Sequence, residues 1–577
     1  MKPVQERLWR RKEYDADLVR TLAAGGNIPR LVAQLLCVRG VESVEEVKRF
    51  LAPSLSDMGD PFLLKGMAEA VDRLALARGR GETICIHGDY DVDGVTSVAL
   101  LMTFLQAVGF SAVYVIPLRL EEGYGLSSDG VDEAARRGAS VLVTVVCGIT
   151  SVGEAALCRE KGIDLIITDH HTPGDVLPDA LAIINPLQPG CNAPFRQLAG
   201  VGLAFKLAVA LRSRLRSDGL FASGGEPNLR EYLDLAALGT IADLVPLKGE
   251  NRIIASFGLK ELTAGGRTGI RELKRVAAVV DPVGSGDVGF RLAPRLNAAG
   301  RLDDAKRGVE LLLTSDRDEA SVIAAELDAA NRERQEIEKE ILSEALAMAQ
   351  SQEMAGRKSI VMASDNWHPG VIGIVASRVV EAFHRPVILI ALQDGVGKGS
   401  GRSIPALHLY NAIAACGEHL VKFGGHKQAA GLTVDEETLE AFTALFDEVV
   451  AGQLTEDDLS PVLQIDAELS PDEITTDLVV QIGLLRPFGM GNPEPLFMLR
   501  GARVLQSRVL KESHLKMRLE ARGRIFDAIG FGMAAKGVDT ELVDITFVPE
   551  LNVWNGSESL QLRLKDIRRS GGDHGAC

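Results

Sequence analysis

Short apolar runs alternate with stretches of helical spacing from about residue 80 onward. The run at 83–88 (TICIHG) ends at a turn, and the apolar residues of 95–109 then recur as on one face of a helix. The same cycle continues along the chain, with strands expected at 111–117, 141–149 and 164–171 and helices at 131–139 and 151–162. Apolar strands alternating with helices predict a parallel sheet covered on both faces. In such a sheet, ligands bind outside the carboxyl ends of the strands.

The second half of the chain changes character twice. Residues 315–355 contain no Gly or Pro and are rich in charge, which predicts one long helix. A second, smaller α/β unit is expected at 356–452. From 457 to 569 the pattern becomes five short strands separated by turns, which favours a small β-barrel of the OB type.

The predicted fold class is therefore α/β, with two α/β lobes joined by a long helix and followed by a C-terminal β-barrel. The first lobe is expected at 61–314, preceded by a helical segment at 1–60 that wraps it. Residues 570–577 (SGGDHGAC) are expected to be a disordered tail.

Composition limits the class of protein. A length of 577 residues suggests about three or four domains, and no apolar run reaches the roughly 18 residues of a membrane span. The seven cysteines form no CxxC pair and the first residues carry no apolar signal region, so we expect reduced thiols in a cytoplasmic protein. The net charge of −16 argues by itself against nucleic acid, although a local basic groove can still bind phosphates.

Polar side chains gather where the predicted strands end. His87, Asp89, Asp91 and Asp93 lie between the first strand and its helix. A helix cap explains one aspartate but not three, and three carboxylates at one strand end repel each other without cations. Oxygen and imidazole ligands suit Mn²⁺ or Mg²⁺ better than zinc in a thiolate site.

Two further clusters repeat this placement. Asp169, His170 and His171 end another apolar strand, and adjacent histidines in extended chain point to opposite sides. One can therefore ligate a metal while the other faces substrate. Asp243 lies in an apolar stretch (LAALGTIADLVPL), where it is either a satisfied turn residue or a ligand.

These motifs carry a family resemblance. HGDYDVDG, TDHH and GTIADLVPL, in this order, resemble motifs I, III and IV of the DHH phosphoesterase superfamily. The resemblance implies two divalent cations, Mn²⁺ or Mg²⁺, that polarise a phosphate and activate a bridging water. It implies His171, Asp91 and Asp93 as catalytic residues. The metal ligands that it implies are His87, Asp91, Asp93, His170 and Asp243.

One position departs from the family pattern. Motif II of the superfamily reads TVDCGI, and its aspartate bridges both metals, whereas this chain has Thr-Val-Val-Cys-Gly-Ile at 144–149. Val146 therefore replaces the expected bridging aspartate, and valine has no lone pair with which to ligate a metal. An inactivating substitution, a variant that recruits another ligand such as Asp89, and a sequence error remain open.

Further motifs indicate contact with nucleic acid. Arginine beside glycine-rich backbone binds phosphate oxygens well, although each such arginine taken alone is more often part of a surface ion pair. The resemblance implies contact with the strand near its 5′ end and assigns the GGHKQAAG stretch to a DHHA1 domain. The expected DNA- or phosphate-binding residues are Arg119, Arg295, Asn297, Arg301, Ser400, Arg402 and His426.

The predicted barrel carries basic residues on successive strands. Basic grooves on OB-folds bind single strands, although the same charges also suit a solvated face. The residues expected on this face are Lys511, Lys516 and Arg518.

The resemblance covers about 60–570 and implies a hydrolase that degrades single-stranded DNA from 5′ to 3′ to mononucleotides in DNA repair and recombination. It implies a monomer in the cytoplasm, with single-strand-binding protein and a helicase as partners. A nanoRNase or phosphoadenosine-phosphate phosphatase lacks the barrel, as does a manganese pyrophosphatase. A catalytically silent DNA-binding scaffold is supported by Val146 alone.

Overall fold

The computed structural model describes residues 7–118, 125–302, 304–354, 356–537, 540–554 and 557–571. The chain divides into two compact units. The parallel-sheet unit comprises Val41–Arg332 and Leu485–Pro493, and the barrel unit comprises Met1–Gly40, Glu333–Leu484 and Glu494–Cys577. Among the described residues, no helix has both the length and the apolar character that a membrane span requires.

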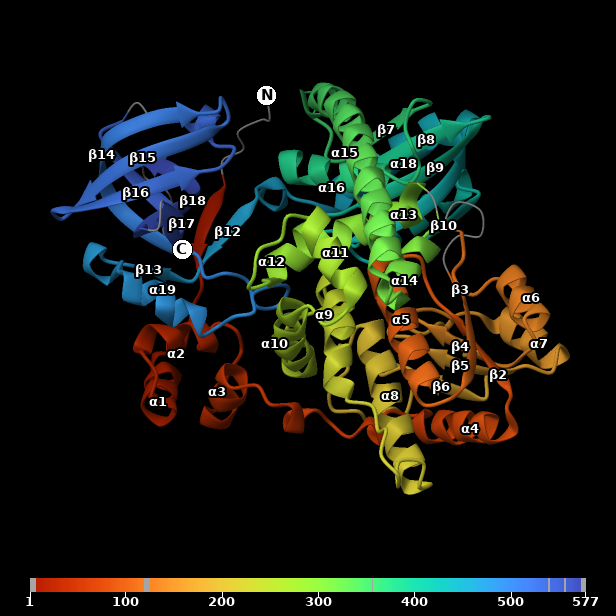
Figure 1. Ribbon diagram of the computed structural model, residues 1–577. Coiled ribbons are helices and arrows are strands. Elements are labelled where there is room, and N and C mark those ends of the chain that lie inside the picture. Colours follow the sequence, from red (N-terminus) through yellow and green to blue (C-terminus); the bar gives the residue numbers. More distant parts are fainter. Residues whose placement is uncertain are drawn as a thin grey trace. The chain divides into compact units, whose positions relative to one another are not determined.

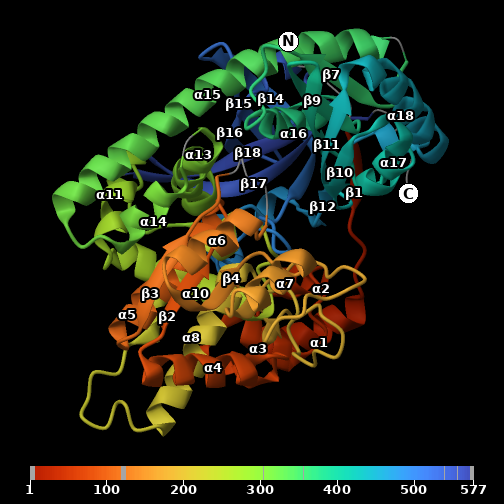
Figure 2. The same ribbon diagram turned by 90° about the vertical axis from the view of Figure 1, so that its right-hand side faces the viewer.

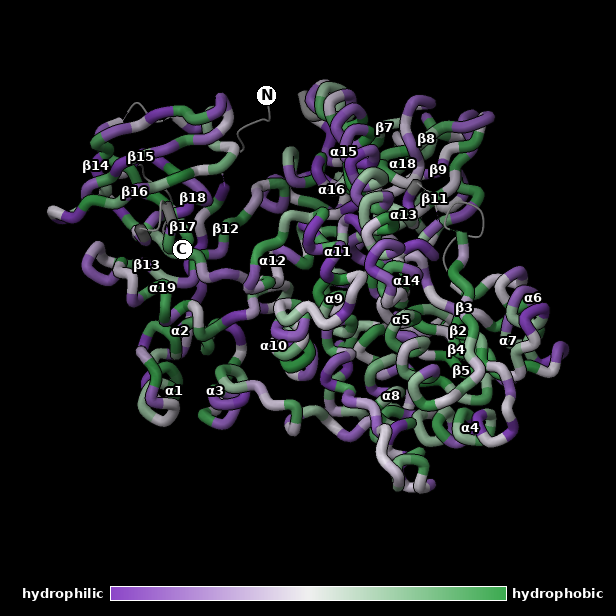
Figure 3. The backbone as a smooth tube through the Cα atoms, viewed as in Figure 1, coloured by the Kyte–Doolittle hydropathy of each residue, from purple (hydrophilic) through white to green (hydrophobic). Residues whose placement is uncertain are grey.

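A five-stranded parallel sheet forms the centre of the parallel-sheet unit, as the sequence predicted (Figure 1). Its strand order is β3-β2-β4-β5-β6. The strands are nearly continuous apolar runs, coloured as hydrophobic in Figure 3, because helices cover both faces. Their bounds are Thr83–His87 (β2), Ser111–Val115 (β3), Ala139–Val145 (β4), Asp164–Thr168 (β5) and Ala182–Ile184 (β6).

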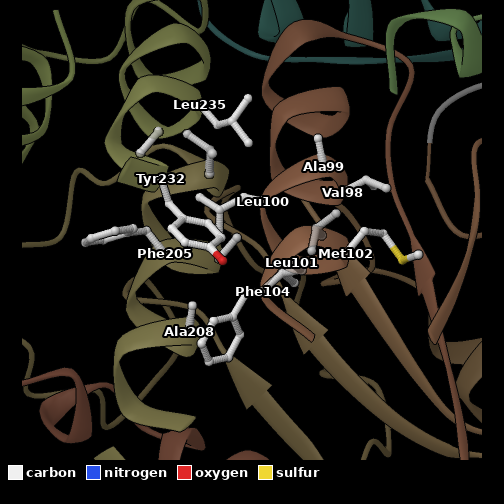
Figure 4. Close-up of a cluster of buried hydrophobic side chains, with 14 of the residues drawn as sticks. Val98, Ala99, Leu100, Leu101, Met102, Phe104, Phe205, Ala208, Tyr232 and Leu235 are labelled. Carbon is white, nitrogen blue, oxygen red and sulfur yellow. The ribbon is translucent and has the colours of Figure 1, made fainter. Parts of the chain in front are cut away.

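Alternate side chains of these strands enter two different cores. Ile84 and Ile86 of β2 belong to the larger core, whereas Cys85 belongs to the smaller one, because successive side chains point to opposite faces. In the larger core Phe104 meets Tyr232 edge to face, with ring centroids 6.3 Å apart (Figure 4). The larger core contains residues of α4 (Met67–Arg80), α5 (Val92–Ala107), α8 (Gly200–Ser217) and α9 (Leu233–Ala242), and the smaller one contains residues of α6 (Ser128–Arg136) and α7 (Val152–Glu160).

The remaining helices of this unit flank α5 and α9 or precede the sheet. A single π-helical turn, η4 (Val288–Leu292), leads into α13. The α-helices are α3 (Val44–Leu51), α10 (Gly249–Ala264), α11 (Thr268–Val276), α12 (Ser285–Asp287), α13 (Ala293–Leu302) and α14 (Lys306–Leu313). The short 3₁₀ turns are η1 (Leu55–Asp57), η2 (Pro61–Leu63) and η3 (Leu229–Tyr232).

The segment Leu485–Pro493, although late in the chain, belongs to this unit, and Arg252 of α10 binds it. Its guanidinium donates hydrogen bonds to the carbonyls of Leu485, Arg486 and Pro487 and lies 3.8 Å from the centroid of the Phe50 ring. The side chain is buried, and Asn492 donates to two of the same carbonyls, those of Leu485 and Pro487, so the two side chains hold this segment together.

We expect Arg252→Ala to lower the free energy of unfolding by about 3 kcal/mol, because it removes the donor to the carbonyls of Arg486 and Phe50 and a charge-assisted contact. Urea unfolding followed by circular dichroism measures this loss. Arg252→Lys keeps the charge but not the planar fork, and we expect it to lose about half as much. An alanine variant as stable as the parent chain would contradict this role.

A mixed five-stranded sheet forms one part of the barrel unit, with order β10-β11-β9-β8-β7. Only β7 and β8 run parallel; the other neighbours are antiparallel. The strands are β7 (Ile360–Ser364), β8 (Val387–Gln393), β9 (Val396–Arg402), β10 (Lys422–Gly425) and β11 (Ala429–Asp435). Its helices are α16 (Ile372–Phe383), α17 (Leu409–Ala414) and α18 (Leu439–Gln453), with turns η5 (Gly417–His419), η6 (Glu436–Thr438) and η7 (Asp457–Leu459).

The C-terminal strands form the expected closed barrel. They follow the order β14-β15-β16-β18-β17, and the pairing of β14 with β17 closes the ring (Figure 1). The strands are β14 (Phe497–Leu510), β15 (His514–Ala521), β16 (Arg524–Gly530), β17 (Leu542–Trp554) and β18 (Ser557–Arg569). The short β13 (Ala467–Glu468) extends β14, and η8 (Pro471–Glu473), α19 (Thr476–Gly483) and η9 (Ala534–Lys536) accompany the barrel.

The N-terminal segment differs from the helical layer predicted around the first lobe. It contains a strand, β1 (Leu8–Arg11), that pairs in parallel with β12 (Val462–Ile465), besides α1 (Ala16–Gly26) and α2 (Arg30–Cys37). Buried Asp466 accepts hydrogen bonds from Lys12 and Arg39. These contacts explain why the first 40 residues group with the barrel unit. A strand this short, paired with a segment near the other end of the chain, leaves little local pattern to read.

The long helix predicted at 315–355 is α15 (Arg317–Met354). Figure 2 shows it as one continuous, gently curved helix. Its first part belongs to the parallel-sheet unit and the remainder, from Glu333, to the barrel unit.

Candidate metal centre

The polar clusters named from the sequence meet at the carboxyl edge of the parallel sheet. His87 ends β2, Val146 follows β4, and His170 follows β5. Strand β2 lies between β3 and β4, which is where the strand order reverses. A reversal of this kind opens a crevice at the strand ends, and ligands of doubly wound sheets bind there.

Asp93 is the most enclosed carboxylate of this edge. It lies in the first turn of α5 and accepts hydrogen bonds from the backbone N–H groups of Gly200 (2.7 Å) and Val201 (2.8 Å), which begin α8. The positive end of a helix thus faces the carboxylate. Burial nevertheless raises the pKa of Asp93 to about 7, and the charge of Asp91 adds to this effect.

Asp93, His170 and Asp243 form a group with the ligand atoms of a cation site. Nε2 of His170 lies 3.6 Å from Oδ2 of Asp93, and Nδ1 lies 3.7 Å from Oδ2 of Asp243. One ligand atom from each residue can be chosen so that all three lie within 4.8 Å of one another. Ligands about 2.1 Å from a common ion are separated by up to about 4.2 Å, so the group needs only a small adjustment.

The protonation chemistry of this group also fits a cation. Burial, followed by the charges of Asp93 and Asp91, raises the pKa of Asp243 to about 9. Burial and the neighbouring His171 lower the pKa of His170 to about 4, which keeps its imidazole neutral and able to offer a lone pair. The buried Nε2 of His170 has no hydrogen-bond partner in the described residues. Two carboxylates and a neutral imidazole are a donor set that Mn²⁺ and Mg²⁺ accept.

His171 is turned toward a different partner. Its Nδ1 lies 2.7 Å from Oδ1 of Asp169, whose other oxygen accepts a hydrogen bond from the backbone N–H of Ile149. Burial alone would lower the pKa of His171, but the hydrogen bond and charge of Asp169 outweigh it, so that the pKa is raised. No role of its own was predicted for Asp169 from the sequence. In the structure its carboxylate orients the ring of His171 and favours the protonated imidazole. The position of Asp169 directly before the two histidines in TDHH was the signal that could have indicated this.

The other polar residues of the first motif lie between the end of β2 and the start of α5. Asp91 caps α5 by accepting a hydrogen bond from the N–H of Gly94 (2.9 Å). Nδ1 of His87 lies 3.8 Å from Sγ of Cys147, and Asp89 is buried. Among the described residues, neither His87 nor Asp91 belongs to a group of three metal-binding side chains.

Val146 occupies the position where the family pattern has an aspartate. It follows β4 with φ of 68° and is only 1 % exposed. A β-branched residue at positive φ is a genuine outlier, which costs about 1–3 kcal/mol, whereas aspartate and asparagine are enriched there. The backbone at this position therefore suits the expected aspartate better than the valine that it carries.

Gly200 keeps the space between Val146 and Asp93 open. A Cβ atom at Gly200 would lie 2.4 Å from Cγ2 of Val146 and 2.8 Å from Oδ2 of Asp93. We expect Gly200→Ala to lower the free energy of unfolding by about 1–3 kcal/mol and to weaken Mn²⁺ binding, because Asp93 is pushed from its backbone donors. Thermal melting with and without Mn²⁺ measures both effects.

Gly202→Ala is the matched control for this prediction. It lies on the same helix, and the nearest atom to its added Cβ would be Cδ2 of Leu198 at 3.1 Å, with Cβ of Leu198 (3.5 Å) and Cδ1 of Ile254 (3.7 Å) at ordinary contact distance. We expect it to be neutral or slightly stabilising, since alanine favours helix. Equal effects at the two glycines would show that the Asp93 contact is not responsible.

The predicted phosphate-binding residues of the parallel-sheet unit have different surroundings. Arg119 lies outside the described residues. Arg295 forms an ion pair with Asp328 (2.9 Å) and donates to a backbone carbonyl of Arg291. Asn297 accepts a hydrogen bond from the backbone N–H of Val92 (3.1 Å), so it positions the start of α5, and Arg301 lies on the same helix, α13. No pattern in the sequence pointed to these supporting contacts.

The predicted phosphate-binding residues of the barrel unit lie on one sheet. Ser400 and Arg402 are two residues apart on β9, so they lie on the same face, and Arg402 donates to Oγ of Ser400 (3.2 Å). Gly373 near the start of α16 faces both, since a Cβ there would lie 2.9 Å from Oγ of Ser400 and 3.0 Å from a guanidinium nitrogen. His426 is exposed in the turn between β10 and β11.

The basic residues of the barrel lie on its outer surface. Lys516 and Arg518 alternate with buried residues of β15, and Lys511 is exposed in the turn before that strand. Arg508 of β14 lies directly opposite Lys516, and within the described chain none of these four side chains forms an ion pair. Like charges placed opposite each other destabilise a sheet, so this surface favours an anionic partner.

Comparison with known proteins gives matches over most of the chain. The DHH family N-terminal domain matches residues 83–240, the DHHA1 domain 356–452 and the RecJ OB domain 465–566. The single-stranded-DNA-specific exonuclease RecJ of Escherichia coli (strain K12) is 42 % identical over 581 residues, which cover 97 % of this chain and 98 % of that protein. RecJ of Bacillus subtilis (strain 168) is 40 % identical over 566 residues, covering 97 % of this chain and 70 % of that protein.

A solved structure gives the same result for the fold. The crystal structure of RecJ from Thermus thermophilus in complex with Mn²⁺ has a TM-score of 0.85 and 33 % identity, covering 99 % of this chain and 81 % of that chain. A second structure, of exonuclease RecJ bound to manganese, has a TM-score of 0.60 and 38 % identity, covering 70 % of this chain and 100 % of that chain. The α/β fold, the barrel and the superfamily resemblance expected from the motifs are thereby confirmed.

Proposed function

Because the chain belongs to the RecJ family of single-stranded-DNA-specific exonucleases, we propose that it hydrolyses single-stranded DNA from the 5′ end and releases mononucleotides with Mn²⁺ or Mg²⁺. The observation that carries this proposal is the group of buried Asp93 with half-buried His170 and Asp243 at the switch point of the parallel sheet. A neutral imidazole between two carboxylates of raised pKa is suited to a cation that contacts a phosphate.

Each side chain of the centre has a distinct task in this proposal. Bound cations would polarise the phosphate and lower the pKa of the attacking water. Asp93 is fixed for its role by the N-terminus of α8, and Asp91 is fixed by capping α5. His171, charged through Asp169, donates a hydrogen bond to a phosphate oxygen and stabilises negative charge there. The proposed ligands are His87, Asp91, Asp93, His170 and Asp243.

Residues outside the metal centre hold the strand. Arg402 and Ser400 beside the start of α16 supply charge and hydroxyl donors for a phosphate, with Arg119, Arg301 and His426 as further phosphate contacts. The outer barrel residues Lys511, Lys516 and Arg518 follow the backbone of the strand. Arg295 and Asn297 act through their neighbours, since each is engaged within the protein.

The setting of this activity is also a proposal. We propose that the chain acts as a monomer in the cytoplasm, in DNA repair and recombination. Single-strand-binding protein and a helicase are the expected partners, because both supply or cover the single strands that such an exonuclease degrades.

The test uses an oligonucleotide with a 5′ phosphate and a fluorescent 3′ end, incubated with Mn²⁺ and the chain. We expect mononucleotides from the 5′ end, no cutting of the matching duplex, and full inhibition by a chelator. Shortening from the 3′ end or internal cleavage would contradict the proposed polarity. Hydrolysis of dinucleotides alone would favour a nanoRNase instead.

A catalytically silent DNA-binding protein is the second candidate, and Val146 is the observation that favours it. A silent protein would bind the oligonucleotide, measured by fluorescence anisotropy, yet release no nucleotide. It would also stay silent when Val146 is replaced by aspartate, because its other groups would have lost their catalytic arrangement.

A further inference from the structure

We infer that this chain binds a single divalent cation tightly, at Asp93, His170 and Asp243, where the family pattern implies two. The inference rests on the proposed function and concerns the occupancy of the same site. Among the described residues, these three side chains form the sole group of three His, Cys, Asp or Glu residues with ligand atoms close enough for one ion.

The side chains that would bind the single cation are already held close together. Two backbone N–H groups of α8 already hold Asp93, and its Oδ2 lies 3.6 Å from Nε2 of His170. Asp243 ends α9, with Oδ2 3.7 Å from the other nitrogen of the same imidazole. Three ligands from three separate elements, two of them negatively charged, give one cation a firm anchorage.

The second position has too few ligands. His87 and Asp91 lie at the end of β2, and among the described residues no third side chain of a ligating type completes a group with them. The affinity of oxygen-ligated cations rises with the number and charge of the ligands. A histidine and one aspartate therefore hold an ion much more weakly than the group of three does.

Val146 explains the difference between the two positions. Its Cγ2 and the Oδ2 of Asp93 both lie beside the same point at Gly200, so the methyl group is at the edge of the metal centre. The side chain is buried and offers no lone pair. An aspartate at the same backbone would add one charged ligand between the two positions and, with φ of 68°, would fit the backbone better than valine.

The number of bound ions tests this inference without an activity assay. The full chain is stripped with a chelator and titrated with Mn²⁺, and free Mn²⁺ is counted by electron paramagnetic resonance alongside calorimetry. We expect one tight ion per parent chain and two per Val146→Asp chain. Val146→Asn fits the same backbone without a negative charge, and we expect it to bind one ion.

The outcomes separate the inference from the proposed function. Two tight ions on the parent chain would overturn the inference while leaving the proposed function in place. One ion on both the parent and the Val146→Asp chain would also overturn it, because Val146 would then not be the cause. Absence of Mn²⁺ binding by every chain, each shown to be folded by circular dichroism, would overturn the proposed function as well.

Discussion

Replacing Val146 by aspartate is expected to raise the rate of Mn²⁺-dependent nucleotide release by at least about 100-fold, because it supplies a charged ligand at the centre of the reaction. The surrounding elements are already arranged for it. Asp93 keeps its backbone donors, and His171 keeps its contact with Asp169. The measurement is single-turnover digestion of a 5′-phosphorylated single strand by equal amounts of the two chains.

Asparagine at this position is the matched control. It tolerates positive φ as aspartate does, and it relieves the same backbone strain without adding charge. We expect Val146→Asn to digest DNA no more than a few-fold faster than the parent. If the asparagine and aspartate variants gain equally, backbone strain limits the rate. If the aspartate variant gains nothing, the missing ligand is not what limits this chain.

The sheet that positions the metal centre could be predicted because its pattern is local. Strands β2, β4 and β5 are short apolar runs, β2 and β5 end in polar residues, and their parallel order follows from the helices between them. The carboxyl ends of such strands meet at one edge. For this reason the sequence placed His87 and His170 at one edge of the sheet, whereas Val146 was singled out by the family resemblance.

The supports of the metal centre could not be predicted in the same way. Gly200 and Val201 bind Asp93 through backbone N–H groups, which leave no mark in the sequence. Asn297 resembled a phosphate ligand but holds the backbone of Val92, which is 205 residues away in the chain. Contacts of this kind depend on how distant elements pack, which spacing and composition do not encode.

The positive φ of Val146 could not be predicted from the sequence either. The sequence showed that an expected aspartate was missing, but only the backbone shows that the position still has the conformation that an aspartate tolerates. The departure from the family pattern is thus confined to one side chain within an otherwise prepared site. Because only this side chain departs from the pattern, the single substitution Val146→Asp tests whether the missing ligand limits the site.

Asp243→Asn is expected to abolish tight Mn²⁺ binding, with a loss of affinity of at least about 100-fold, and yet to stabilise the metal-free protein. The carboxylate is one of three ligands, and an amide cannot replace its charge. Without a cation, however, burial and the charges of Asp93 and Asp91 oppose its ionisation and raise its pKa to about 9. A neutral amide removes this penalty.

The sign of the pH dependence follows from the same shift. The unfolded chain releases this proton near the ordinary pKa of aspartate, about 3.9, whereas the folded chain retains it until about pH 9. Between these values the folded state binds more protons, so metal-free stability falls as pH rises. We expect a shallower fall for Asp243→Asn, and we expect Mn²⁺ to stabilise the parent chain most at high pH.

Asp234→Asn provides the control on the same helix. Asp234 is also buried, but it pairs with Arg267 (3.1 Å) and lies outside the group that can hold a cation. Asparagine at this position removes the charge beside Arg267 and leaves Asp93, His170 and Asp243 untouched, so we expect unchanged Mn²⁺ binding. Thermal melting of both variants across pH, with and without Mn²⁺, distinguishes a ligand from a structural aspartate. If Asp243→Asn melted lower than the parent without metal, Asp243 would stabilise the fold itself and its assignment as a metal ligand would lose this support.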